Sequence, residues 1–247
     1  MRIIRVEHGG TSYYGILEDG LVFRLHQQPG HMEPIPLSEA KVLPLVTPSK
    51  VVCVGLNYKA HAEELGYPLP NMPSFFLKPP SSIIGNGEPI VLPSGMGRIE
   101  HEAELAMVVG KVCRNLTPEE AEESLFGFTC ANDVTAREVQ KVDPLIGHCK
   151  SYDTFCPIGP WIETELEDIN DLSIRCLVNG EVRQSANTGD MIFRPLDLLC
   201  FLSRVMTLMP GDVILTGTPP GISPIQADDV VQVSIEGIGT LSNPVEG

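Results

Sequence analysis

Short apolar runs with strand-like spacing predict that β-strands dominate this chain. Three β-branched or aromatic runs open it, MRIIRVE, TSYYGIL and LVFRL, and Asp19–Gly20 between the last two favours a tight hairpin turn. We therefore expect a small β meander at the N-terminus. Further strands are predicted at VVCVGL, PIVL, ELAMVVGKV, SLFGFTCA, SIRCLV, DVILTG and VVQVSI.

A segment rich in proline and polar residues, 26–50, separates the meander from these later strands and predicts a connection between two regions. We place the division so that residues 1–47 form a small N-terminal β-rich domain and residues 48–247 form a larger one. Few helices are expected. Together these patterns predict an α+β fold built on a mixed β-sheet.

Two helices are marked by their end signals. Thr117-Pro118-Glu119-Glu120 combines an N-cap, a proline at the first helical position and a capping-box glutamate, so a helix should run to about Ser124. The second is RPLDLLCFLSRVM, residues 194–206, followed by the helix-ending pair Pro210–Gly211. Neither helix carries obvious chemistry.

Composition and charge exclude several classes of function. The chain has 17 basic and 32 acidic residues, a formal charge of −15, which disfavours binding to nucleic acid or an anionic membrane. It has no signal-like apolar start and no run of about 20 apolar residues, so we expect a cytoplasmic protein. Seven scattered cysteines without a Cys-x-x-Cys pair indicate buried thiols rather than disulfides or a zinc site.

Alternating acids precede one apolar strand in RIEHEAELAMVVG, residues 98–110. In a strand, Glu102 and Glu104 share one face about 7 Å apart along the backbone, and His101 points to the other face, where we expect a structural role. Burying two carboxylates is unfavourable unless positive charge lies between them. The alternative is a solvated edge strand.

A third acid, Asp133, ends the predicted strand SLFGFTCAND. Considered alone, it is better explained as the cap of the following turn, paired with Arg137. If it instead converges on Glu102 and Glu104, the three carboxylates form an all-oxygen site suited to Mg²⁺ or Mn²⁺, and less to Zn²⁺.

The segment GLNYKAHAEELG, residues 55–66, predicts a short helix capped by Asn57 and ended by Gly66. His61 and Glu64 then lie on one face, where a carboxylate can orient an imidazole that acts as a general base. By spacing alone, an ordinary solvated helix face is the better explanation of the pair.

Seven blocks in order make the chain similar to the fumarylacetoacetate hydrolase family: GLNYKAHAEE, SFFLKPPSSIIG, IEHEAELAMVVGK, GFTCANDVTAREVQ, GHCKSYDTFCPIGPW, GDVILTGTPPGI and IEGIGTLSNPV. The resemblance implies a mixed β-sheet roll of that type with a small N-terminal β-rich domain, assembled as a homodimer. It also implies that Glu102, Glu104 and Asp133 hold Mg²⁺ or Mn²⁺, with Ca²⁺ as a further option, and that His61 and Glu64 form a catalytic pair on a lid.

The same resemblance implies roles for four more residues. Lys150 matches the family's catalytic lysine beside the metal, Arg137 and Gln140 match its substrate-side residues, and Thr218 matches the threonine that holds a substrate carboxylate. Lys78 is a weaker candidate, because the prolines that follow it predict a rigid turn of structural use.

The implied chemistry is metal-dependent turnover of a small carboxylate, a 2-oxo or β-diketo acid, through a metal-bound enolate. We rank carbon–carbon bond hydrolysis first and isomerisation or decarboxylation of 2-hydroxy-diene dioates or 2-oxo diacids second. Leu56 and Asn57 depart from positions associated with acylpyruvate and fumarylacetoacetate cleavage, which weakens those particular reactions. A non-catalytic metal- and acid-binding scaffold is the alternative from another class.

Overall fold

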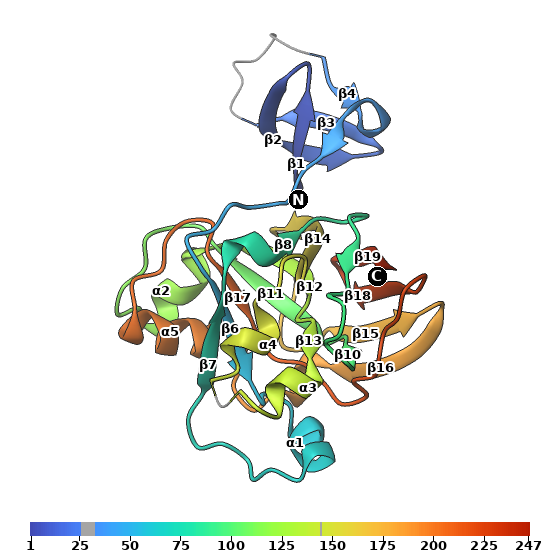
Figure 1. Ribbon diagram of the computed structural model, residues 1–247. Helices are drawn as coiled ribbons and strands as arrows, with labels where there is room; N and C mark the ends of the chain where they lie inside the picture. The colour runs from blue at the N-terminus through green and yellow to red at the C-terminus, as the bar shows by residue number, and fades with distance from the viewer. Residues whose placement is uncertain (26–32, 144) are drawn as a thin grey trace.

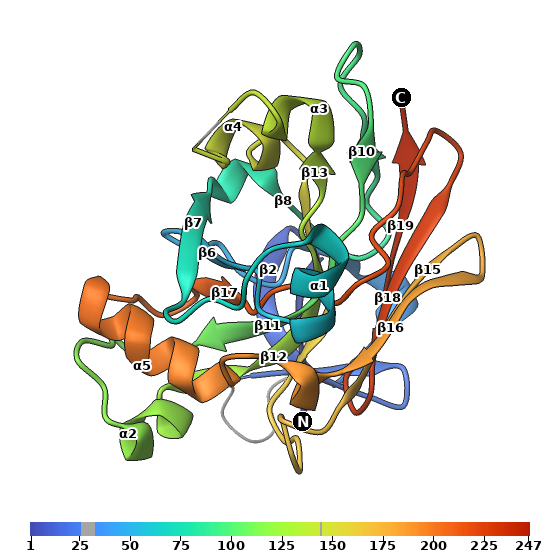
Figure 2. The same cartoon turned by 90° about the horizontal axis from the view of Figure 1, so that it is seen from below.

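The computed structural model describes residues 1–25, 33–143 and 145–247 (Figures 1 and 2). Within these residues the strands form a mixed sheet of twelve strands, a second sheet of five strands and a small sheet of two strands. The predicted fold class is confirmed: a mixed β-sheet architecture with few helices and a small N-terminal β-rich part.

The strands are β1 (Arg2–His8), β2 (Thr11–Glu18), β3 (Leu21–Arg24), β4 (Ile35–Pro36), β5 (Lys41–Val42), β6 (Val51–Gly55), β7 (Ser74–Lys78), β8 (Ile83–Ile84), β9 (Ile90–Val91), β10 (Ile99–Glu100), β11 (Ala103–Val109), β12 (Leu125–Asn132), β13 (Thr135–Ala136), β14 (Cys156–Glu163), β15 (Ser173–Val178), β16 (Glu181–Asn187), β17 (Val213–Leu215), β18 (Val230–Ile235) and β19 (Gly239–Glu246). The helices are α1 (Lys59–Leu65), α2 (Pro118–Glu123), α3 (Arg137–Gln140), α4 (Gly147–Lys150) and α5 (Pro195–Val205).

The N-terminal meander forms as predicted. Strands β1, β2 and β3 pair antiparallel, and Asp19 and Gly20 both have positive φ, as a two-residue hairpin turn requires. The connecting segment is less irregular than predicted, because β4 pairs with β3 and β5 pairs with β1. Two-residue strands depend on a partner rather than on local pattern. Residues 26–32 lie outside the described part of the chain.

The meander is continuous with the large sheet, whose order is β4-β3-β2-β1-β14-β12-β11-β17-β6-β7. In Figure 1 the N-terminal strands lie at the top and most of the sheet below them. Because β1 pairs with β14 in this single sheet, the division into two domains at residue 47 stays a prediction.

Strand β11 lies at the centre of the sheet, between β12 and β17. Leu105 and Met107 enter one apolar core, and Ala106 and Val108 enter the other. Burial on both faces explains why this strand is a continuous apolar run rather than an alternating one.

Four strands of five or more residues were missed from the sequence: β7, β14, β16 and β19. Two prolines interrupt β14, and β16 is mostly polar, so neither has a strand-like pattern. Pairing stabilises them: β14 lies between β1 and β12, and β16 pairs with β15. The five-stranded sheet has the order β16-β15-β18-β19-β9.

Both helices marked by end signals are present. Thr117 and Glu120 form the reciprocal capping box of α2, and α5 begins with Pro195. The two helices pack against each other at one side of the sheet (Figures 1 and 2). In the described residues, no helix is long and apolar enough to span a membrane.

Candidate active site

Strand pairing brings the three predicted metal ligands together. Glu104 lies on β11, Glu102 directly precedes β11, and Asp133 directly follows β12. The Asp133 amide donates to the Glu102 carbonyl oxygen at 2.9 Å, which joins the two segments beyond the ladder. All three carboxylates are buried, and one oxygen from each lies within 4.8 Å of the others.

Two buried lysines connect these acids. Lys150 Nζ donates to Glu102 Oε2 at 2.7 Å and to Asp133 Oδ2 at 2.6 Å. Lys78 Nζ donates to Asp133 Oδ1 at 2.5 Å and to the Phe155 carbonyl oxygen at 2.7 Å. We underrated Lys78 from the sequence, because the prolines after it do form a turn while its side chain points inward to Asp133.

Arg137 connects the next acids. Its Nε donates to Glu100 Oε2 at 2.6 Å, its Nη2 binds Glu102 Oε1, and its Nη1 donates to Gln140 Oε1 at 2.8 Å. The simpler interpretation of Asp133 was therefore wrong. Arg137 pairs with glutamates instead, and α3 begins after Ala136 without a side-chain cap.

The buried lysines and Arg137 compensate the charges of the three acids unequally, as the pKa values of Glu102 and Glu104 show. Burial would raise the pKa of Glu102, but the charges of Lys150 and Arg137 outweigh it and hold that pKa below its usual range. Burial raises the pKa of Glu104 well above its usual range, and the charges of Asp133 and Glu102 raise it further. Glu104 is thus the acid whose charge is least compensated.

The predicted catalytic pair forms on α1. His61 Nδ1 lies 2.8 Å from Glu64 Oε2, and the His61 ring is buried although α1 is a surface helix. Because Nδ1 faces the carboxylate, Nε2 is the nitrogen that can exchange a proton with a bound molecule.

One loop, residues 216–221, joins this pair to the acids. The Gly217 amide donates to Glu104 Oε2 at 2.5 Å, and the Gly221 amide donates to Glu64 Oε1 at 3.0 Å. Gly217 has φ +99°, and a Cβ there would lie 2.7 Å from the Asn57 Cβ, so only glycine fits. The loop therefore positions α1 relative to the carboxylate cluster.

Thr218, in the same loop, is buried beside β11. Its hydroxyl donates to the Ala103 carbonyl oxygen at 2.9 Å and accepts from Gln184 Nε2 at 2.8 Å. Gln184 Oε1 also accepts from the Ala103 amide and contacts His101 Nδ1. We did not identify Gln184 from the sequence, because it lies in a polar strand, 34 residues from Thr218 and more than eighty from Ala103 and His101.

Two expectations about neighbouring residues had different outcomes. His101 points away from the carboxylates and contacts Gln184 and Ser223, which agrees with the structural role predicted for it. Asn57 does not cap α1. Its amide donates to the Phe193 and Thr216 carbonyl oxygens, and Tyr58 is the N-cap, while Gly66 ends the helix as predicted.

The donor set fits a hard divalent cation. Among the residues that the structure describes, the cluster consists of three converging carboxylates without a nitrogen or sulfur ligand, and such an all-oxygen set is what Mg²⁺ or Mn²⁺ prefers. The raised pKa of Glu104 is a further sign, because added positive charge there would stabilise its ionised form. The acidic triad thus indicates a divalent metal site.

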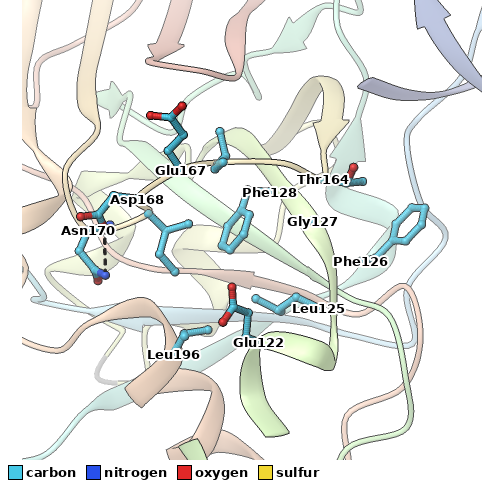
Figure 3. A pocket seen from close by; sticks show the side chains of 12 residues that line it. Glu122, Leu125, Phe126, Gly127, Phe128, Thr164, Glu167, Asp168, Asn170 and Leu196 are labelled. Carbon is cyan, nitrogen blue, oxygen red and sulfur yellow. Dashed lines mark hydrogen bonds between the residues drawn. The ribbon is translucent and has the colours of Figure 1, made fainter. Parts of the chain in front are cut away.

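A separate surface pocket lies at the other end of β12, lined by Phe126, Phe128, Glu122, Glu167 and Asp168 among others (Figure 3). It shares no residue with the carboxylate cluster. Asp133 is five residues along the strand from Phe128, about 16 Å at strand spacing. This pocket is therefore distinct from the candidate active site.

Comparisons with known proteins identify the family. The model described as Fumarylacetoacetate (FAA) hydrolase C-terminal matches residues 50–246, and the one described as Rv2993c-like, N-terminal matches residues 1–44. The chain belongs to the fumarylacetoacetate hydrolase family. It is an enzyme of that family, which includes hydrolases and isomerases or tautomerases.

Three relatives illustrate the range of reactions. The structure of 5-carboxymethyl-2-hydroxymuconate delta-isomerase from Mycobacterium smegmatis is 42% identical, with TM-score 0.92, covering 100% of this chain and 98% of that one. A mitochondrial oxaloacetate tautomerase of Homo sapiens is 42% identical over 85% of this chain and 71% of its own length. Maleylpyruvate hydrolase from Sphingobium sp. SYK-6, solved with manganese(II) and pyruvate, is 30% identical with TM-score 0.83, covering 100% and 99%.

Proposed function

We propose that this protein is a divalent-metal-dependent isomerase or tautomerase of small 2-oxo dicarboxylates and their 2-hydroxy-diene forms. The observation that carries the proposal is the buried Glu102–Glu104–Asp133 cluster with Lys150 between two of its acids. We now rank isomerisation above carbon–carbon bond hydrolysis, the reverse of the order favoured by the sequence. The reason is that two relatives that are 42% identical carry the names of an isomerase and a tautomerase.

A divalent cation held by the three carboxylates would supply a Lewis acid for a 2-oxo group and its adjacent carboxylate. Lys150 and Arg137 supply positive charge where the substrate gains negative charge, and both are buried and already ionised beside carboxylates. Burial would lower the pKa of Lys150, but Asp133 and Glu102 raise it above its usual range, so Lys150 stabilises charge rather than acting as a base.

In this proposal His61 moves the proton. Glu64 orients the ring through Nδ1, and Nε2 can deliver a proton to one carbon of the substrate or remove it from another. Arg137 with Gln140, and Thr218, would orient the substrate carboxylates.

A substrate panel tests this proposal. With Mn²⁺, we expect the enzyme to accelerate either the loss of the ultraviolet absorbance of the oxaloacetate enol or the isomerisation of 2-hydroxyhepta-2,4-diene-1,7-dioate. EDTA should abolish the acceleration. Tight Mn²⁺ binding without acceleration of any panel member would contradict the proposal and favour the non-catalytic scaffold.

Carbon–carbon bond hydrolysis is the second candidate, favoured by the His61–Glu64 pair, which can activate a water molecule. Glu64→Gln tests this candidate. In a hydrolase we expect kcat for acylpyruvate cleavage to fall by about 10²-fold, because a neutral amide cannot support the protonated ring. Full-rate cleavage in this variant would exclude water activation by the pair.

The native metal and the homodimer stay predictions. Isothermal titration with Mg²⁺, Mn²⁺ and Ca²⁺ would rank the metals. Size-exclusion chromatography with light scattering would give the mass of the protein in solution, to be compared with the 26.9 kDa of one chain.

A further inference from the structure

A continuous row of alternating charges runs from the carboxylate cluster to the protein surface. Its order is Lys78, Asp133, Lys150, Glu102, Arg137, Glu100 and Arg98, and each neighbouring pair is an ion pair. The innermost lysine side chain is 0% exposed and the outermost arginine side chain is 48% exposed. The row therefore ends in a cation that solvent and ligands can reach.

Arg98 is attached to this row at one point. Its Nε lies 3.2 Å from Glu100 Oε1, whereas Glu100 Oε2 is held by Arg137. Among the described residues, no hydrogen bond or ion pair involves its two Nη groups. The nearby Glu138 is paired with Lys141. Those Nη groups can therefore form a two-point contact with a carboxylate.

The backbone places Arg98 on the side of the metal ligands. Arg137 binds both Glu100 and the metal-ligand candidate Glu102, and Arg98 pairs with Glu100 on the outer side of that arginine. The Arg137 amide donates to the Arg98 carbonyl oxygen at 2.8 Å, where β10 and β13 pair beside α3 (Figure 2).

The charges of the row match a dianion. Four cations and three carboxylates leave one positive charge, which Glu104 cancels when ionised. A divalent cation then brings the total to plus two, so a dicarboxylate neutralises the site and a monocarboxylate does not.

We propose that Arg98 binds the distal carboxylate of the substrate and so selects dicarboxylates. This inference rests on the proposed function and adds a specificity-determining residue to that same site. The 2-oxo acid end lies at the three metal ligands, and the other carboxylate reaches the outer end of the row.

A matched pair of ligands tests this role by binding, without turnover. 2-Oxoadipate and 2-oxohexanoate have the same carbon chain, and only the first has a second carboxylate. Isothermal titration into the Mn²⁺-loaded protein should show that wild type prefers 2-oxoadipate. Arg98→Gln should reduce that preference by about 10-fold, because a charge-assisted contact is lost, and should leave 2-oxohexanoate affinity unchanged.

Two variants act as controls. Arg98→Lys keeps the charge but loses the planar fork, so it should retain part of the preference. Arg175→Gln removes an exposed arginine on β15, outside the row, and should change nothing. An unchanged preference in Arg98→Gln, or equal loss of both ligands, would overturn the role of Arg98. If wild type binds neither ligand while it binds Mn²⁺, the proposed function fails with it.

Discussion

Two buried aspartates in this protein are held in opposite ways. Asp212 is fully buried, and its carboxylate accepts from the Ser49 and Met209 amides, the Ser49 hydroxyl and Lys50. Asp133 pairs with Lys78 and Lys150. Lys78 also donates to the Phe155 carbonyl oxygen, and Lys150 also binds Glu102. The donors of Asp212 bind no other acid, whereas Asp133 belongs to a cluster that shares its cations.

The pKa values express the same contrast. Burial would raise the pKa of Asp212, but hydrogen bonds from Lys50, Met209 and Ser49 hold it below its usual range. In the cluster, burial and neighbouring acids raise the pKa of Glu104. A buried acid whose charge its own donors compensate is structural, and a buried acid whose charge is left uncompensated indicates a site for an added cation.

Removing one ligand should give the largest effect. In Glu102→Gln or Asp133→Asn we expect Mn²⁺ affinity to fall by more than about 100-fold, since even outer partners of metal ligands contribute 10- to 100-fold. The free energy of unfolding without metal should also fall, because either change removes a carboxylate partner of the buried Lys150. Isothermal titration and urea unfolding in EDTA measure the two quantities, and wild-type affinity in either variant would refute the ligand assignment.

Asp212→Asn should lower stability alone. We expect the free energy of unfolding to fall by about 2 kcal/mol, because charge-assisted hydrogen bonds to Ser49 and Lys50 are lost at a buried position. Mn²⁺ affinity should not change. Urea unfolding gives the first quantity and titration of folded protein the second. A variant that loses metal affinity but not stability would break the distinction between the two regions.

The pH dependence should separate the regions by its sign. Glu104 has a raised pKa in the fold, so its contribution to stability is present below the ordinary glutamate pKa, about 4.3, and is lost as pH rises through the raised value. Asp212 has a lowered pKa, so its contribution is present above about 3.9 and is lost as pH falls through the lowered value.

This sign difference gives the smallest expected effect, a shift in melting temperature. Mn²⁺ should raise the Tm more as pH increases above 4.3, because it binds the ionised form of Glu104. Glu104→Gln should flatten the metal-free Tm profile in that range. Differential scanning calorimetry across pH, with Mn²⁺ and with EDTA, checks both, and a metal-induced shift that shrinks with rising pH would contradict the assignment.

Local pattern determined much of this protein. The hairpin at Asp19–Gly20, the capping box of α2, the start of α5 and the end of α1 at Gly66 follow from backbone preferences within a few residues. The alternation of Glu102 and Glu104 likewise follows from strand geometry, and seven ordered motifs were enough to recognise the family.

Only the tertiary structure decided how the charges are paired. Lys78 reaches Asp133 across 55 residues, Lys150 reaches Glu102 across 48, and Gln184 reaches Thr218 across 34. Sequence spacing cannot show such contacts, because strand pairing between distant segments brings them together. For the same reason Asp133 was a cap by local pattern and a cluster carboxylate in the fold: the burial and shared cations that define its chemistry exist only after β11 and β12 have paired.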